Sequence, residues 1–167
     1  IYEHELLPLA PTRENIQKMV SEFATETTIN IRDFAILQLL TVYGLRSSEV
    51  AYLQLDDLDW QKEIIYVRRS KGCKPQLFPL TPTVGDAIIH YLKEARPNGS
   101  SLREVFLTQI GPYKKLNNSS IYAIINKILK PMDWNIKSCG PHCLRYASAT
   151  YLINTGFSLK EISDYLG

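Results

Sequence analysis

The chain has 167 residues, of which 45% are hydrophobic and 22% are charged, and this composition is typical of a globular domain rather than a disordered or collagen-like chain. No apolar run approaches the ~18 residues needed to span a bilayer, and no basic-then-apolar leader marks the chain for export. Three cysteines, an odd number, do not form a secreted disulfide framework. We therefore expect one domain over residues 1–167, in the cytoplasm, with no membrane contact.

The formal net charge of +2 is the sum of unlike segments. Residues 1–60 hold 4 basic and 10 acidic side chains, residues 61–80 hold 5 basic and 1 acidic, and residues 111–146 hold 6 basic and 1 acidic. Two basic segments separated by a neutral one indicate a surface that faces a polyanion, provided that folding brings them together. The alternative is that each basic segment is merely a solvated face.

Helical signals dominate the chain. Asn30 and Gly44 are typical caps of one helix, Thr81-Pro82 is a typical helix start, and Ser158 with Glu161 forms a capping box. Apolar spacing and these caps predict helices over about 12–25, 30–44, 47–53, 82–95, 121–130, 141–154 and 158–166.

The remaining apolar segments favour short strands. Ile64–Val67 and Leu77–Leu80 flank a polar, glycine-containing turn, so they predict a β-hairpin. Val105–Thr108 predicts a third short strand. The expected fold is a mainly helical α+β domain with a small antiparallel sheet.

The first candidate site follows the helix stop at Gly44. Arg46 lies at the mouth of a new helix, where its planar guanidinium can bind a phosphate with the help of backbone N–H groups. Glu49 lies three residues further on the same helical face and can hold that guanidinium in place. The alternative is a structural ion pair that joins two helices.

Two further positions carry side chains suited to an anion. Lys71 lies beside Gly72 in the hairpin turn and can reach a phosphate or donate a proton, although turns commonly carry solvated lysines. His142 and Arg145 follow Pro141 on one helical face, so both can address one anionic oxygen near a helix N-terminus. The alternative is a capping histidine with a snorkelling arginine.

The cysteines are candidate metal ligands. Cys139, His142 and Cys143 form one crowded cluster, and Cys73 lies far away in the sequence. Zinc sites usually show two paired clusters of ligands. We therefore expect no metal site and interpret these cysteines as small core residues.

Four motifs occur in a fixed order along the chain: Gly44-Leu45-Arg46-x-Ser48-Glu49, Lys71-Gly72-x-Lys74, Pro141-His142-x-Leu144-Arg145-Tyr146 and Ile162-x-x-x-Leu166-Gly167. In these motifs the chain resembles the catalytic domain of the tyrosine recombinase (phage integrase) family. The resemblance extends from about Asn30 to the last residue and implies that family's fold.

The resemblance also implies roles for the candidate residues. Arg46 and Arg145 match the arginines that clamp the scissile phosphate, and Lys71 matches the lysine that protonates the leaving 5′ oxygen. His142 matches a hydrogen-bond donor or proton shuttle, and Glu49 matches a supporting acid. The implied reaction breaks and rejoins DNA through a 3′-phosphotyrosine intermediate and needs no cofactor, neither ATP nor a metal ion.

The implied partners are double-stranded DNA and other protomers assembled on it. The basic segments supply the expected DNA contacts, which are Arg68, Arg69, Lys74, Lys114 and Lys115.

The family's nucleophilic tyrosine lies on a helix after the Leu-Gly step, and none of the ten tyrosines matches it. Tyr146 adjoins Arg145 and Tyr165 precedes Leu166, so neither is expected to attack DNA. We expect residues 1–167 to be inactive in isolation, the tyrosine being encoded after Gly167 or supplied by another protomer. Residues 1–11 resemble a linker, and nothing corresponds to an N-terminal domain that clamps DNA.

Two other functions are compatible with the same residues. One is a DNA-binding module of this fold that has lost catalysis and only occupies sites. The other is a helical interaction domain that does not bind nucleic acid, although it leaves the two basic segments without a purpose.

Overall fold

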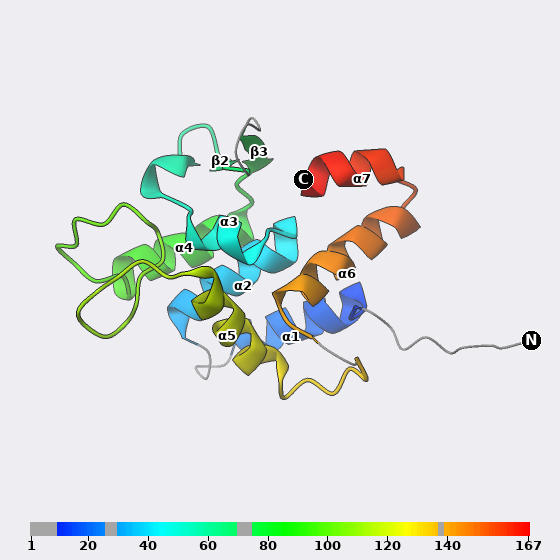
Figure 1. Cartoon of the computed structure of the whole chain (residues 1–167), viewed down its shortest axis with the longest axis horizontal. Coiled ribbons are helices and arrows are strands. Elements are labelled where there is room, and N and C mark those ends of the chain that lie inside the picture. The colour runs from blue at the N-terminus through cyan, green and yellow to red at the C-terminus, as the bar shows by residue number, and fades with distance from the viewer. Residues whose placement is uncertain (1–9, 26–29, 70–74, 137–138) are drawn as a thin grey trace, which may run out of the picture.

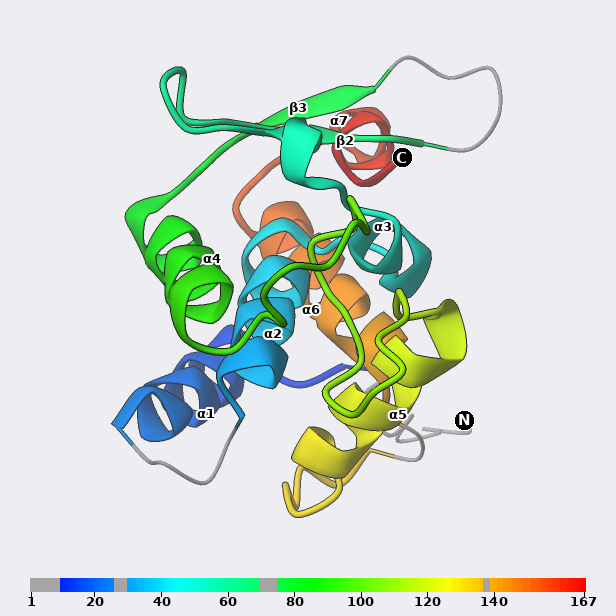
Figure 2. The same ribbon diagram turned by 90° about the vertical axis from the view of Figure 1, so that its left-hand side faces the viewer.

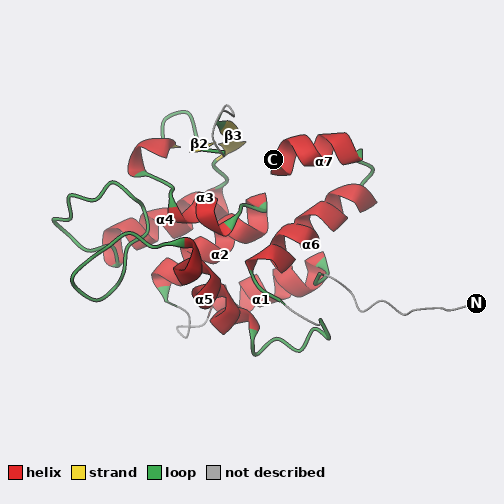
Figure 3. Ribbon diagram, viewed as in Figure 1, coloured by secondary structure: helices red, strands yellow, loops and turns green. Residues whose placement is uncertain are grey.

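Helices are the dominant secondary structure of the molecule (Figures 1 and 3). The structure is a computed structural model that describes residues 10–25, 30–69, 75–136 and 139–167. Its helices are α1 (Arg13–Thr25), α2 (Ile31–Tyr43), α3 (Ser47–Ala51), α4 (Pro82–Glu94), α5 (Asn118–Leu129), α6 (Pro141–Asn154) and α7 (Leu159–Leu166). The seven predicted helices are confirmed, except that α3 ends at Ala51, before the buried Leu53, and that α5 begins at Asn118 rather than near 121.

The capping residues act as expected. The side chain of Asn30 accepts a hydrogen bond from the backbone N–H of Arg32 at 2.9 Å, and Pro82 is the first residue of α4. Ser158 and Glu161 bond reciprocally, since each side chain accepts from the other residue's backbone N–H. These bonds satisfy donors that the first turn of a helix leaves free.

The sheet has three antiparallel strands in the order β1-β2-β3: β1 (Leu58–Asp59), β2 (Ile64–Val67) and β3 (Gln76–Pro79). The predicted hairpin is confirmed by β2 and β3, whose pairing runs from Ile64↔Pro79 to Val67↔Gln76. Its turn, residues 70–74, lies outside the described residues.

The third strand is β1, and the prediction of a strand over 105–108 is wrong. Val105 and Leu107 are buried there as a strand would be, but Leu107 forms only an isolated antiparallel bridge with Lys115, and other backbone groups of the segment bond to side chains. The N–H of Leu107 donates to the hydroxyl of Tyr91 at 3.1 Å, and the carbonyl of Val105 accepts from Nε of Arg96 at 3.2 Å. Side chains in and after α4 thus satisfy backbone groups that a ladder would have paired.

The core is built around α2, which packs against α4 and α6. Leu37, Leu39 and Leu40 are completely buried, and burial of each such side chain contributes about 1.5–3 kcal/mol. The sheet lies at one end of this helical body, and α7 lies beside it; Figure 2 shows α7 nearly end-on next to β2 and β3. The end of α7 therefore meets the hairpin and the α2–α3 junction.

Gly44 is the residue that lets this junction close. It has a φ of 64°, and a Cβ built on it would lie 3.0 Å from Cδ2 of Leu166 and 3.1 Å from Cβ of Ser148. The left-handed conformation suits glycine, and the missing side chain allows α6 and α7 to approach.

We predict that Gly44→Ala lowers the free energy of unfolding by about 2–4 kcal/mol, because backbone strain and crowding both act there. The matched control is Gly99→Ala, since Gly99 has a φ of 74° and open space around it. The free energy of unfolding of Gly99→Ala should fall by only ~1 kcal/mol, from backbone strain alone. Equilibrium denaturation in urea measures both, and equal losses would show that Gly44 makes no close approach.

Candidate active site

Arg46 is placed by the sharp transition between two helices. It follows Gly44 and Leu45 and caps α3, where its backbone N–H donates to Oε2 of Glu49 at 2.8 Å. Its Nη1 donates to Oε1 of the same carboxylate at 3.3 Å. The expected Arg46–Glu49 pair is therefore present, with Arg46 44% exposed and Glu49 5% exposed. The acid is buried, and the guanidinium that it holds faces outward.

Arg145 extends from α6 toward the same place. Its Nη1 donates to the carbonyl of Gly44 at 2.9 Å, and its Nη2 donates to the carbonyls of Leu166 at 2.6 Å and Gly167 at 3.0 Å. Arg46 also donates to the carbonyl of Gly167. Two guanidinium groups from distant parts of the chain thus converge on one oxygen atom.

The convergence has an electrostatic cost. Burial is the main cause that lowers the pKa of Arg145, and the positive charge of Arg46 lowers it further, while Glu49 opposes the shift. The charged guanidinium is therefore held where it is less stable than in water. An anion that entered between the two arginines would relieve this cost.

His142 lies in the first turn of α6, as predicted, and its side chain is exposed. Its ring stacks against Tyr122 at a centroid distance of 6.5 Å and meets Tyr146 edge-on at 6.2 Å. The ring of His142 thus lies against two aromatic rings, and its role with Arg145 toward one anionic oxygen stays a prediction.

The predicted DNA contacts differ in their surroundings. The exposed Arg68 pairs with buried Asp57 at 3.0 Å. Lys114 and Lys115 are exposed, and Nζ of Lys115 lies 5.7 Å from the centroid of the Tyr52 ring. Lys71 and Lys74 lie outside the described residues.

Arg69 departs from the expectation of a DNA contact, because its side chain is only 6% exposed. Its Nη1 lies 2.8 Å from Oε1 of Glu49, and its Nη2 donates to Oε1 of Gln76 at 2.5 Å. It also donates to the carbonyls of Tyr165 and Leu166 at the end of α7. This geometry directs Arg69 into the protein rather than toward a ligand.

Sequence reasoning missed this role, although a signal exists. Ile65 and Val67 are buried on β2, and a strand returns to the same face every second residue. Arg69 lies two residues after Val67 and takes the same buried face of the strand, whereas Arg68 takes the opposite, outward face. The alternation therefore indicates an inward arginine.

The thiols of Cys139 and Cys143 interact with each other. Burial, followed by the hydrogen bond with Cys143, raises the pKa of Cys139 to about 12. A thiol with that pKa is protonated at neutral pH, whereas metal ligation needs the thiolate. Across the described residues, no group of three or more His, Cys, Asp or Glu side chains could hold a metal ion. The same residues include no helix that is long and apolar enough to cross a membrane.

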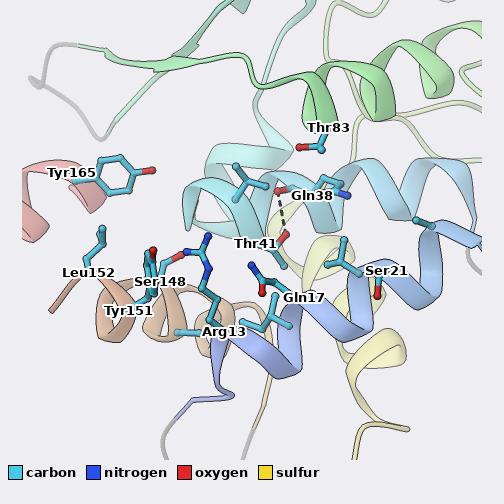
Figure 4. Close-up of a pocket in the computed structure, with 15 residues that line it drawn as sticks. Arg13, Gln17, Ser21, Gln38, Thr41, Thr83, Ser148, Tyr151, Leu152 and Tyr165 are labelled. Carbon is cyan, nitrogen blue, oxygen red and sulfur yellow. Dashed lines mark hydrogen bonds between the residues drawn. The ribbon is translucent and has the colours of Figure 1, made fainter. Parts of the chain in front are cut away.

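A separate cavity of about 520 Å³ has none of Arg46, Arg69 and Arg145 in its lining (Figure 4). Its lining is mostly apolar and comes mainly from α1, α2 and α6, with Tyr165 from α7. Arg13 covers the ring of Tyr151 at 3.8 Å. Tyr165 packs edge-on against Phe78 at 5.3 Å, and burial raises its pKa. Tyr165 thus lines the cavity with its side chain, while its carbonyl accepts from Arg69.

Comparison with known proteins gives consistent matches. Residues 12–167 match the model of the phage integrase family. The chain is 40% identical over 152 residues to the Sinorhizobium fredii protein named "Putative integrase/recombinase y4gC", covering 89% of this chain and 77% of that protein. It is 33% identical over 168 residues to the tyrosine recombinase XerD of Listeria innocua, covering 96% of this chain and 54% of XerD.

The fold also resembles that of a solved recombinase structure. The crystal structure of the XerH site-specific recombinase bound to its difH substrate superposes with a TM-score of 0.78 at 20% identity, over 96% of this chain and 47% of that chain. The chain therefore spans about half the length of XerD and XerH, and more of y4gC. The expected mainly helical α+β fold is confirmed.

Proposed function

Because the chain belongs to the phage integrase family, we propose that it is the catalytic domain of a site-specific recombinase or integrase that breaks and rejoins double-stranded DNA. The observation that carries the proposal is the convergence of Arg46 and Arg145 on one oxygen atom. Two planar, permanently charged groups that meet in this way suit the oxygens of a phosphodiester.

In the proposed mechanism a tyrosine hydroxyl attacks the scissile phosphorus and loses its proton to His142 or to water. The new bond joins the tyrosine oxygen to phosphorus, the bond to the 5′ oxygen breaks, and that oxygen receives a proton from Lys71. Arg46 and Arg145 stabilise the charge that develops on the phosphate, and His142 donates a hydrogen bond or shuttles a proton. Glu49 holds Arg46 in position.

The covalent 3′-phosphotyrosine retains the energy of the broken bond, so rejoining is the reverse reaction and consumes neither ATP nor a metal ion. We place the nucleophile outside residues 1–167, either later in the polypeptide or on another protomer, and propose that these residues alone do not cleave DNA. The reaction on DNA and the family together favour a cytoplasmic protein that assembles with other protomers on its site.

The DNA contacts that we propose are the exposed cations Arg68, Lys114 and Lys115, together with Lys74. The structure of the Tn1549 transposon integrase in complex with circular intermediate DNA supports DNA as the partner, since that protein shares this fold. Arg69 is left out of this set, because its guanidinium is turned inward.

The proposal is tested with the full-length protein and a nicked suicide duplex, whose site is first selected by the protein from a randomised library. We expect a protein–DNA adduct that survives denaturation and that is absent with an unselected duplex. We also expect affinity to fall at least about tenfold between 50 and 200 mM salt.

The remaining outcomes separate the alternatives. Salt-dependent binding without an adduct would identify a DNA-binding module that has lost catalysis. Affinity that does not change with salt would contradict any phosphate contact and favour a protein-interaction domain.

A further inference from the structure

We propose that Arg69 is a positioning residue of the recombination reaction, which sets the relative places of Arg46, Arg145 and the hairpin. This role in catalysis rests on the proposed function, whereas the contacts of Arg69 do not depend on it. Arg69 itself touches no substrate, because its side chain is 6% exposed and its donors point at protein groups.

The first connection of Arg69 leads to Arg46. Both guanidinium groups bond to the same atom, Oε1 of Glu49, at 2.8 Å from Arg69 and 3.3 Å from Arg46. A buried carboxylate with two cationic partners has little freedom to rotate. Arg69 therefore fixes the acid that orients Arg46.

The second connection leads to Arg145. Arg69 and Arg145 both donate to the carbonyl of Leu166, and Arg69 also donates to the carbonyl of Tyr165 at 3.1 Å. The last carbonyls of a helix carry partial negative charge and lack partners within the helix. The two arginines thus bind the end of α7 through one shared oxygen atom.

The third connection leads to the hairpin. Val67 and Gln76 are the last paired residues of β2 and β3, and the bond from Arg69 to Gln76 lies one step beyond them. Arg69 therefore ties β3 to the chain that follows β2, one step beyond the last pair of the two strands.

The fit around the guanidinium is close on the side of α7. A Cβ built on Gly167, whose φ is 81°, would lie 2.5 Å from Nη1 of Arg69 and 2.7 Å from its Cζ. Among the described residues, Nε of Arg69 is buried and has no hydrogen-bond partner. A buried charge that leaves one donor unpaired is expensive, and it is retained here where three structural elements meet.

The test compares Arg69→Gln with Arg103→Gln in the full-length protein. Arg103 also forms an ion pair, with Asp56, but both partners are exposed. At saturating suicide DNA, we expect Arg69→Gln to slow single-turnover adduct formation about 100-fold, because a small displacement of the catalytic groups is costly. Its affinity for DNA should stay within about threefold of wild type, and the control should match wild type in both.

A second measurement does not depend on activity. Hydrogen exchange of the amides of residues 159–166 should become at least about tenfold faster in Arg69→Gln, whereas exchange in α1 should not change. Wild-type rates of both cleavage and α7 exchange in Arg69→Gln would overturn the inference. If the wild-type protein forms no adduct, the proposed function fails, and the α7 exchange alone then decides whether Arg69 holds this helix.

The variant Arg69→Lys covers the case in which Arg69→Gln does not fold. Lysine keeps the charge beside Glu49, but it lacks the planar guanidinium that reaches Gln76 and two carbonyls at once. A folded Arg69→Lys protein with slow cleavage supports positioning, and one with the wild-type rate contradicts it. Unfolding of both variants would also overturn the inference, since it would reduce Arg69 to a residue needed for stability.

Discussion

Arg145→Ala is expected to lower the single-turnover rate of adduct formation about 10³-fold at saturating DNA. The substitution removes a planar donor that would face the phosphate as its charge develops. Folding should suffer much less, by about 1 kcal/mol, because the hydrogen bonds lost at Gly44 and Leu166 are offset by relief of repulsion from Arg46. Quenched-flow sampling on denaturing gels gives the rate, and thermal unfolding checks the fold.

The conservative variant Arg145→Lys makes this test specific. Lysine keeps the positive charge but cannot donate two parallel hydrogen bonds, so we expect a rate about 10²-fold below wild type. A rate for Arg145→Ala within tenfold of wild type, with an intact fold, would show that this arginine does not bind the reacting phosphate.

Glu49→Ala is expected to lower the free energy of unfolding by about 3–5 kcal/mol, because it leaves the guanidinium of Arg69 buried without its carboxylate. It also removes the acceptor of the backbone N–H of Arg46. The matched control is Asp56→Ala, whose exposed pair with Arg103 should contribute less than about 0.5 kcal/mol. Urea denaturation of both variants measures the difference.

A double variant separates the cost of an orphaned charge from the value of the pair. Glu49→Leu with Arg69→Met should recover most of the lost stability, because apolar residues of similar size often replace a buried ion pair without loss. Equal stability of Glu49→Ala and Asp56→Ala would mean that Arg69 finds water or another acceptor when Glu49 is gone.

Local signals predicted the helices well, because the bonds that end a helix are made within a few residues. Asn30 and Gly44 bound α2 where the sequence indicates, and the same holds for Ser158 at the start of α7. The sheet was predicted only in part. A strand of two residues such as β1 has no periodicity to detect.

Tertiary contacts decide the features that the sequence did not reveal. Val105 and Leu107 are as apolar as strand residues, but Nε of Arg96 binds the carbonyl of Val105 and the hydroxyl of Tyr91 accepts from the N–H of Leu107. In the site, the pairing of Arg46 with Glu49 was predicted because it is local. The side chain of Arg69 points inward because it bonds to α7, almost a hundred residues away in the sequence. Only the alternation of buried and exposed residues along β2 indicates this orientation.

The shared carboxylate of Glu49 sets a charge balance for the reaction. Arg46, Arg69 and Arg145 against Glu49 alone leave this cluster with a net charge of +2. A phosphodiester brings one negative charge, and its pentacovalent transition state brings a second. The cluster is therefore overcharged for bound DNA and neutralised only at the transition state, so its electrostatic attraction is greatest for the state that catalysis must stabilise.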